Sequence, residues 1–231
     1  MRTFLPALIF LAAAAPADAA TRNFGVSGFD RIRVDGPFKV RLATGVAPFA
    51  TASGGSPAAL DSVTIDVQGR TLVVRSNRSS WSGYPGEAKG PVEISIGTHD
   101  LSAAWLNGSG SLAVDKAKGL SFDLSVQGAG SASIGSVTVD HFKVAISGTG
   151  TASVAGTAPK LTAIVRGISS LDASGLVSKD AIIGAQGPAT VRANVSNTAK
   201  VDAQGAATIE LAGRPACTVK ATGSATVSGC R

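Results

Sequence analysis

Hydrophobic and polar residues alternate one by one along much of this chain, most regularly over its second half. A two-residue period is that of a β-strand, because successive side chains point to opposite faces. Five segments with this period are each expected to bury one face and expose the other, with Asp123, Ser125, Lys143, Thr162, Lys200 and Asp202 among the outward residues. Their inward residues are Phe122/Leu124/Val126, Phe142/Val144/Ile146, Leu161/Ala163/Val165, Ala181/Ile183/Ala185 and Ala199/Val201/Ala203.

A short phrase built around glycine follows each of these segments, and the phrase recurs. The clear copies are Asn107-Gly-Ser-Gly-Ser, Gln127-Gly-Ala-Gly-Ser, Ser147-Gly-Thr-Gly-Thr, Arg166-Gly-Ile-Ser-Ser, Gln186-Gly-Pro-Ala-Thr and Gln204-Gly-Ala-Ala-Thr, and Lys220-Ala-Thr-Gly-Ser is a degenerate seventh. Their starts are separated by 20, 20, 19, 20, 18 and 16 residues. A period near twenty with strands and no helical pattern predicts a solenoid of short β-coils. A propeller blade of about 40 residues fits it less well.

Stacking the phrases extends the pattern to their far side. Glycine at the second position of the first six phrases predicts a corner, where φ is free to be positive. A second strand then follows, with Leu112/Val114, Ala132/Ile134, Ala152/Val154, Val191/Ala193 and Ile209/Leu211 inward.

Two outward columns also emerge from this stacking. The first carries a hydroxyl in every repeat: Ser111, Ser131, Thr151, Ser170, Thr190, Thr208 and Ser224. Parallel coils place equivalent residues about 4.8 Å apart, so these hydroxyls are expected to form a ladder. The second column reads Ala113, Ser133, Ser153, Asp172, Arg192, Glu210 and Thr226. Its acid–base–acid run predicts charge pairing between neighbouring coils, which supports this register.

The first half of the chain shows the same alternation without the short repeat, in segments that start at Phe29, Phe38, Val63, Leu72 and Val92. A solenoid exposes apolar coil ends, so a terminal unit is expected to be atypical and to act as a cap. The predicted fold is therefore all-β: a single-stranded parallel β-helix with an N-terminal β cap. Residues 20–231 are expected to form one domain, with the cap and first coils in 20–100 and about seven coils of 16–20 residues in 101–231. The usual chirality of parallel connections favours right-handed winding.

Composition narrows the class of protein. Of 231 residues, 28 are glycine, 44% are hydrophobic and only 16% are charged, which excludes a coiled coil and argues against disorder. The net charge is +6, but charged residues are sparse and the basic ones are not interleaved with aromatic residues. No nucleic-acid partner is therefore expected. Salt-sensitive attraction to anionic envelope polymers, such as lipopolysaccharide, is the expected consequence of this charge.

The first nineteen residues have the features of a signal peptide. Arg2 supplies a positive charge, the apolar stretch 4–15 is too short to span a bilayer, and Ala17-Asp18-Ala19 offers a cleavage site. The mature chain has no other apolar run of transmembrane length. Export to the periplasm or cell surface of a bacterium is therefore expected, and it favours a disulfide between Cys217 and Cys230.

An ordered series of weak motifs links this chain to a known family. The series opens with Phe29-x-x-Ile32-x-Val34-x-Gly36-x-Phe38-x-Val40-x-Leu42 and continues with Gly69-Arg-Thr-Leu-Val-Val, Val92-Glu-Ile-Ser-Ile, His99-Asp-Leu101 and Asn107-Gly-Ser-Gly-Ser. In order and spacing, from about Phe29 to Thr226, the chain resembles the putative auto-transporter adhesin, head GIN domain family (DUF2807). The resemblance implies an exported bacterial β-helix, and it brings no catalytic residues to carry over.

Candidate catalytic and metal-binding residues are few. His99 and His141 lie about forty residues apart without neighbouring carboxylate or cysteine motifs, so neither a metal nor a cofactor is expected. Asp172 and Glu210 are the one aligned acid pair, two coils or about 9.6 Å apart, as in some polysaccharide-cleaving enzymes. Arg192 between them would keep both ionised, so a structural role is favoured over catalysis.

Candidate binding residues are Trp81 and Tyr84, in an irregular Gly- and Pro-rich segment. Trp81 has two interpretations, stacking on a sugar or covering the open coil end, and the second is favoured. The sequence thus predicts a non-enzymatic, exported cell-envelope β-solenoid that serves as an adhesin, binding module or structural module. The alternatives are a polysaccharide-acting enzyme that uses Asp172 and Glu210, and a glycan- or ice-binding solenoid that uses the Ser/Thr ladder.

Overall fold

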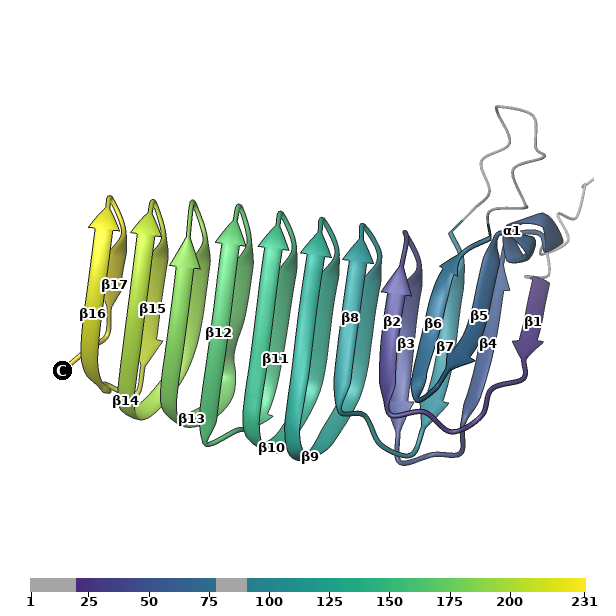
Figure 1. Ribbon diagram of the computed structural model, residues 1–231, viewed down its shortest axis with the longest axis horizontal. Coiled ribbons are helices and arrows are strands. Elements are labelled where there is room, and N and C mark those ends of the chain that lie inside the picture. Colours follow the sequence, from purple (N-terminus) through teal and green to yellow (C-terminus); the bar gives the residue numbers. More distant parts are fainter. Residues whose placement is uncertain (1–19, 78–90) are drawn as a thin grey trace, which may run out of the picture.

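The computed structural model describes residues 20–77 and 91–231, which form an elongated β-solenoid (Figure 1). The expected signal peptide and the segment with Trp81 and Tyr84 lie outside these residues. One short helix, α1 (Pro57–Asp61), accompanies the strands of the described part. The strands are β1 (Ala20–Phe24), β2 (Arg31–Asp35), β3 (Lys39–Thr44), β4 (Phe49–Gly54), β5 (Val63–Gln68), β6 (Thr71–Ser76), β7 (Glu93–Thr98), β8 (Ala103–Gly108), β9 (Ser111–Gly128), β10 (Ser131–Gly148), β11 (Thr151–Thr157), β12 (Lys160–Gly167), β13 (Ser170–Gln186), β14 (Thr190–Gly205), β15 (Thr208–Ala212), β16 (Ala216–Gly223) and β17 (Thr226–Ser228).

Each coil of the solenoid contributes one stretch of strand to each of two layers. The long strand β9 shows this directly, because its residues 111–114 pair with β3 whereas its residues 123–128 pair with β8. Layer A contains β6, β2, β8, β12, β16 and the second halves of β9, β10, β13 and β14. Layer B contains β7, β3, β11, β15, β17 and the first halves of those long strands. Figure 1 shows the coils side by side along the long axis. The predicted parallel β-solenoid is confirmed, and its handedness stays a prediction.

The predicted register is confirmed over most of its length. Ser131 lies opposite Thr151, and Thr151 lies opposite Ser170, so these hydroxyl residues stand in single file. The file runs from Ser111 to Thr208.

Its last member was predicted wrongly, because Thr226 and not Ser224 lies opposite Thr208, and Ser228 rather than Thr226 lies opposite Glu210. The seventh phrase begins two residues later than expected, since Gly223 pairs with Gly205 and takes the corner position with a φ of +78°.

The corners require glycine for two reasons. Gly128 and Gly148 have φ values of +101° and +100°, which side chains other than glycine rarely adopt. A Cβ atom on Gly128 would also lie 2.7 Å from the carbonyl oxygen of Gly108, the equivalent corner one coil earlier. Successive corners are therefore stacked backbone on backbone, with no room for a side chain between them.

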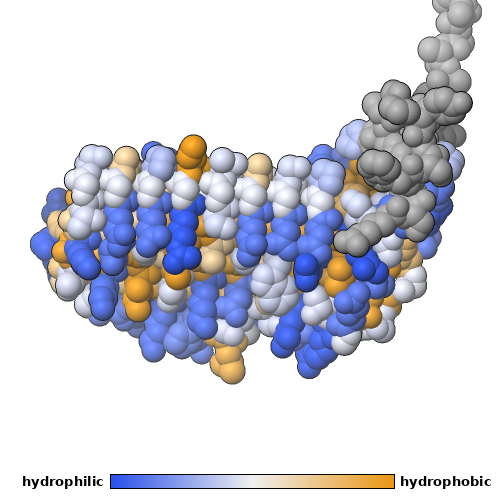
Figure 2. Space-filling view, turned by 45° about the horizontal axis from the view of Figure 1, so that its top comes forward, coloured by the Kyte–Doolittle hydropathy of each residue, from blue (hydrophilic) through white to orange (hydrophobic). Residues whose placement is uncertain are grey.

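The interior is one apolar cluster that extends from Phe29 to Leu211, and all the inward columns predicted above are buried in it. Phe122 and Phe142 occupy equivalent positions on neighbouring coils, and their rings stack with centroids 6.1 Å apart. Outside the core, hydrophilic and pale residues form rows across the strands, interrupted by a few hydrophobic patches (Figure 2). None of the described helices is long and apolar enough to cross a membrane.

The N-terminal end is built in an unexpected order. The pair β2–β3 lies between the pair β6–β7, which comes later in the chain, and the pair β8–β9. Beyond β6 and β7, the antiparallel strands β5, β4 and β1 form the predicted β cap, together with α1. The first coil in the sequence is thus not the first coil in space.

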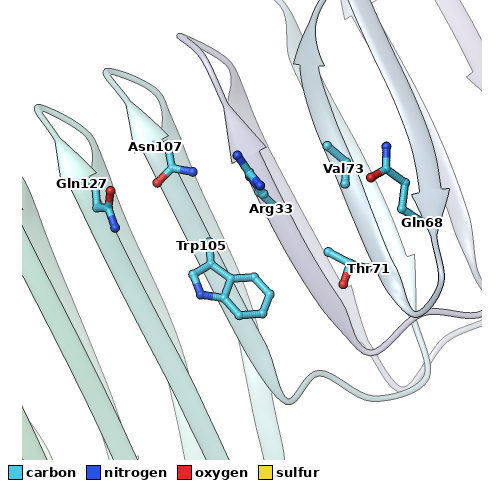
Figure 3. Close-up of a pocket in the computed structure, with 7 residues that line it drawn as sticks. All are labelled: Arg33, Gln68, Thr71, Val73, Trp105, Asn107 and Gln127. Carbon is cyan, nitrogen blue, oxygen red and sulfur yellow. The ribbon is translucent and has the colours of Figure 1, made fainter.

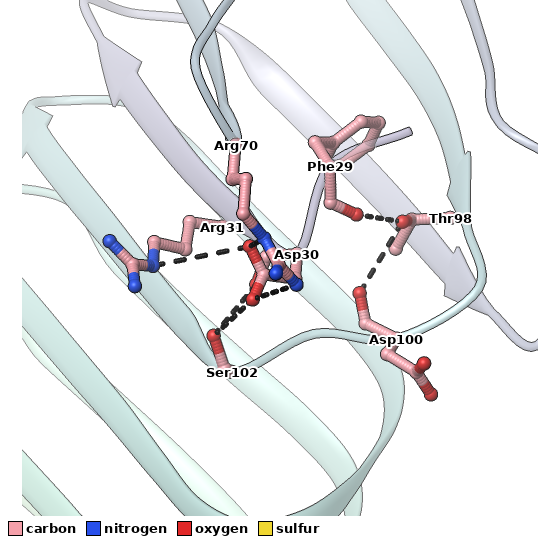
Figure 4. Close-up of polar contacts among 7 residues, drawn as sticks. All are labelled: Phe29, Asp30, Arg31, Arg70, Thr98, Asp100 and Ser102. Carbon is pink, nitrogen blue, oxygen red and sulfur yellow. Dashed lines mark hydrogen bonds and ion pairs between the residues drawn. The ribbon is translucent and has the colours of Figure 1, made fainter. Parts of the chain in front are cut away.

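Asp30 fixes this inserted coil at the start of β2 (Figure 4). Its carboxylate accepts two hydrogen bonds from Arg70, at 3.0 and 2.9 Å, and one from the Ser102 hydroxyl at 3.2 Å. Arg70 precedes β6 and Ser102 precedes β8, so one side chain joins three neighbouring coils. On the adjacent turn, the Thr98 hydroxyl donates to the Phe29 carbonyl.

The C-terminal end is closed by a covalent bond. Cys217 on β16 and Cys230 form a disulfide, which confirms the predicted pairing. The bond joins the last strand of layer A to the residues after β17.

Candidate binding site

Trp105 is the most conspicuous aromatic residue on the outer surface of layer A. In β8 the alternation buries Ala104 and Leu106, so Trp105 between them points outward and is half-buried. Its neighbours across the strands are Arg33 on β2 and Ser125 on β9. The same period-two rule that builds the core therefore places this indole on a rigid sheet face.

A hollow of about 500 Å³ opens beside this indole, a volume typical of small-molecule sites. Figure 3 shows the indole between Asn107 and Gln127 on one side and Thr71 and Gln68 on the other, with Arg33 above it. The lining residues are Arg33, Gln68, Thr71, Val73, Trp105, Asn107 and Gln127. They come from β5, β6, β2, β8 and β9, so the inserted β2–β3 coil helps to create the hollow.

Hydrogen bonds hold three of the polar side chains of this hollow, Arg33, Asn107 and Gln68, in position. Asp35 accepts from Arg33 Nε at 3.0 Å and from Asn107 Nδ2 at 2.6 Å. Gln68 Nε2 donates to Asp66 at 3.0 Å. Because Asp35 neutralises Arg33, the hollow combines little net charge with several amide groups, which both donate and accept hydrogen bonds.

An indole flanked by amides suits a neutral sugar ring. The C–H face of a pyranose packs on an aromatic face, while its hydroxyls exchange hydrogen bonds with amide side chains. The described residues that line the hollow include no nucleophile–base pair that would support catalysis. No group of three or more His, Cys, Asp or Glu side chains among the described residues is placed to hold a metal ion.

The structure does not test the binding residues predicted from sequence. Trp81 and Tyr84 fall outside the described residues, so their role stays a prediction. Sequence reasoning missed Trp105, although a signal was present: it is a tryptophan at an outward position, two residues before the first glycine phrase. His99 and His141 are both exposed.

The Ser/Thr ladder lines a shallow groove of about 450 Å³ on layer B. One wall carries Ser111, Ser131, Thr151 and Ser170, and the other carries Ala113, Ser133, Ser153 and Asp172. Most of the described residues that line this groove have small side chains, and none of them is aromatic or carries an amide side chain.

The expected acid–base–acid run is only half formed. Arg192 Nε lies 2.8 Å from Glu210 Oε2, and this hydrogen bond and charge raise the pKa of Arg192. Asp172 instead accepts hydrogen bonds from the hydroxyl and the backbone N–H of Ser174, at 2.6 and 3.1 Å. These bonds lower the pKa of Asp172, with a smaller contribution from Arg192. A general acid needs a raised pKa, so Asp172 is poorly suited to that role.

Comparisons with known proteins agree with this fold. A crystal structure of a putative adhesin from Bacteroides fragilis matches with a TM-score of 0.79 at 16% identity, over 92% of this chain and 97% of that one. A putative adhesin from Parabacteroides merdae and a putative lipid binding protein from Parabacteroides distasonis each match with a TM-score of 0.67 at 17% identity, over 90% of this chain and 95% of theirs. No curated protein matches the chain.

The family model described as putative auto-transporter adhesin, head GIN domain, matches residues 28–215. This range covers the cap apart from β1, the inserted coil, the Trp105 hollow and all but the last coil of the solenoid. The chain therefore belongs to the head GIN domain family of putative auto-transporter adhesins.

Proposed function

We propose that this protein is a non-enzymatic adhesion module that binds a neutral polysaccharide of the bacterial envelope in the Trp105 hollow. One observation carries the proposal: an outward indole is fixed on a rigid sheet beside three amide side chains, of which Asn107 and Gln68 are held by hydrogen bonds to carboxylates. Residues 20–231 act as a single binding domain in this proposal.

Two further features support an envelope location. The first nineteen residues have the pattern of a signal peptide, and the disulfide between Cys217 and Cys230 favours an oxidising compartment. Adhesin descriptions among the relatives and in the family name agree with a binding role.

The test is a glycan array and a pull-down of envelope fractions with residues 20–231. Trp105→Ala is expected to reduce affinity at least tenfold, because the apolar platform is lost, whereas Trp105→Phe should keep part of it. Both variants should melt near the wild-type temperature, since the side chain lies outside the core.

A matched pair of amide variants sharpens this test. Gln127 and Gln186 occupy the same outward column, three coils apart, but only Gln127 lines the hollow. Gln127→Ala should weaken glycan binding, and Gln186→Ala should not. If no neutral carbohydrate binds, or if Trp105→Ala binds as well as the wild type, the proposal is wrong.

The same assay separates the alternatives. Loss of glycan binding in Trp81→Ala/Tyr84→Ala without a change in melting temperature would assign the site to that segment instead. Turnover of an acidic glycan that disappears in Asp172→Asn would show that the protein is an enzyme.

Lipid binding, the property named for the Parabacteroides distasonis relative, is a second candidate function. One observation of this chain favours it: a second hollow on layer A, of about 660 Å³, has the exposed Ile182 beside Lys160 and Lys200 among its lining residues, together with Asp180 and several threonines.

A further inference from the structure

Another hollow, of about 370 Å³, opens on the outer surface of layer B, where the solenoid meets the cap strand β4. Its volume is in the range of small-molecule sites. Four neighbouring strands line it in the order β4, β7, β3 and β9. Because Trp105 stands on layer A, this hollow faces the opposite side of the molecule. The outward side chains that line it are Arg41, Ala43, Phe49, Ser95, Ala113 and Asp115.

Phe49 forms an aromatic wall of this hollow, which is called the Phe49 hollow below. In β4 the alternation buries Ala50 and Ala52, so Phe49 points outward and is 42% exposed. It stands opposite Gly97 on β7, and a Cβ atom at Gly97 would collide with two carbon atoms of the phenyl ring. The ring is therefore held against the Gly97 backbone, and the rest of its surface is open to solvent.

Small side chains form the floor between Phe49 and the opposite wall. Ala43 is the next outward residue after Arg41 on β3, and Ser95 and Ala113 stand opposite Arg41 on the two neighbouring strands. These short side chains leave room for a ring to approach the sheet beside the phenyl group.

Asp115 on β9 provides a fixed hydrogen-bond acceptor, three strands away from Phe49. Its Oδ1 accepts from the backbone N–H groups of Thr44 and Lys116, at 3.0 and 2.6 Å, and from the Thr44 hydroxyl at 3.4 Å. Within the described part of the chain, no group donates to its Oδ2. One carboxylate oxygen thus holds the side chain in place, and the other is available to a ligand.

Arg41 provides donors between Phe49 and Asp115. Its side chain is 64% exposed, and its Nη1 lies 3.6 Å from Glu93, which already accepts a hydrogen bond from Lys39 at 2.6 Å. The lining of the hollow contains one arginine and one aspartate, and the adjacent Lys39 and Glu93 also balance each other. The hollow therefore has donors, acceptors and an aromatic surface but no excess of either charge, which favours a neutral, hydroxyl-rich ligand.

We infer that the Phe49 hollow is a second sugar site, in which a neutral pyranose packs on the phenyl ring and exchanges hydrogen bonds with Arg41 and Asp115. The C–H face of the sugar contacts the ring, while neighbouring hydroxyls accept from the guanidinium and donate to the carboxylate. A phenyl ring is a smaller platform than an indole, so this site is the weaker of the two. The second site presupposes the proposed function, because it assigns the same class of ligand to the opposite face.

Two sites on opposite faces make the protein bivalent. One polysaccharide chain bound over Trp105 and another over Phe49 would be separated by the two layers of the solenoid, so a single molecule would connect two chains. Connection of chains raises the apparent affinity for a polymer above that for a short oligosaccharide.

The test measures binding of cellotetraose, maltotetraose, mannotetraose and galactotetraose to residues 20–231 by isothermal titration calorimetry. The Trp105→Ala variant isolates the second site and is expected to keep weak binding of one tetrasaccharide per protein. In that background, Phe49→Ala and Arg41→Gln should each weaken the remaining binding at least tenfold. Phe49→Trp should strengthen it, because the aromatic platform becomes larger, and this gain does not depend on the stability of the alanine variant.

Matched controls are Lys39→Gln and Ile168→Ala in the same background. Lys39 contacts Glu93 as Arg41 does but does not line the hollow, and Ile168 is 68% exposed at a distant corner. Neither substitution should change the remaining affinity. Light scattering with the polymer of the bound sugar should show cross-linking by the wild type and none by Phe49→Ala or Trp105→Ala.

The outcomes separate the two sites. If Trp105→Ala binds no sugar that the wild type binds, or if its binding survives Phe49→Ala, the second site is wrong and the Trp105 site stands. If Phe49→Ala abolishes binding and Trp105→Ala leaves it unchanged, the Phe49 site stands and the Trp105 site is wrong. If the wild type binds none of the four sugars, the second site fails, and the glycan array decides the proposed function separately.

Discussion

Single glycines determine whether the coils can stack. Gly128 combines a positive φ with a close approach to the Gly108 carbonyl, whereas Gly184 lies in an open outward position. We predict that Gly128→Ala lowers the free energy of unfolding by about 1–3 kcal/mol or more, because the strained backbone conformation alone costs that much. Gly184→Ala should leave it unchanged or raise it by about 0.5–1 kcal/mol. Urea unfolding of both variants checks this, and similar losses would contradict it.

The Asp172 carboxylate provides a second prediction at this scale. Hydrogen bonds from Ser174 lower its pKa, so its signal in a carbon-detected NMR titration should move at a pH below the ordinary aspartate value. Ser174→Ala should raise the pKa towards that value. A folded-state pKa below the unfolded one means a stabilisation that is present above the unfolded pKa and is lost as the pH falls through the folded pKa.

That stabilisation is small, because Asp172 is exposed. A pKa of Asp172 above the ordinary aspartate value would contradict this assignment and would reopen the catalytic interpretation.

At the scale of elements, the strands and their faces could be predicted from the sequence because both depend on local alternation. The two-residue period places Phe142, Val144 and Ile146 on one face, whichever strand lies beside them. The predicted register of the last coil was wrong because its glycine phrase is degenerate. The hydroxyl of Ser224 matched the Ser/Thr column, but Gly223 decides where the corner lies. Backbone conformation is the stronger constraint, since serine and threonine fit many outward positions.

The last coil has a single covalent anchor, so it offers a prediction of its own. We expect Cys217→Ser/Cys230→Ser to lower the stability of β16 and β17 by up to about 3 kcal/mol, the value for closing a loop of about 15 residues. Coils in a solenoid interact mainly with their neighbours, so β10 should keep its stability. Amide hydrogen exchange resolves the two regions. A uniform loss of protection along the solenoid would contradict the expectation.

At the scale of the whole molecule, the order of the coils could not be predicted. The alternation in β2 and β3 specifies strands with one buried face, but it does not say which strands lie beside them. The tertiary contacts that select β6 and β8 as the neighbours of β2 include the hydrogen bonds of Asp30 to Arg70 and Ser102, which are 40 and 72 residues away. The Trp105 hollow escaped prediction for the same reason, since its lining comes from five strands that only this order brings together.

The position of the β2–β3 pair also affects how the protein can fold during its synthesis. A chain that leaves the ribosome N-terminus first exposes Ile32 and Val34 long before Leu72 and Leu106, the residues beside them in the finished sheet. Folding therefore cannot proceed vectorially from the first residues. The nascent β2 strand gains its first neighbour, β6, only after about 40 further residues have been synthesised, and its second neighbour, β8, only after about 72.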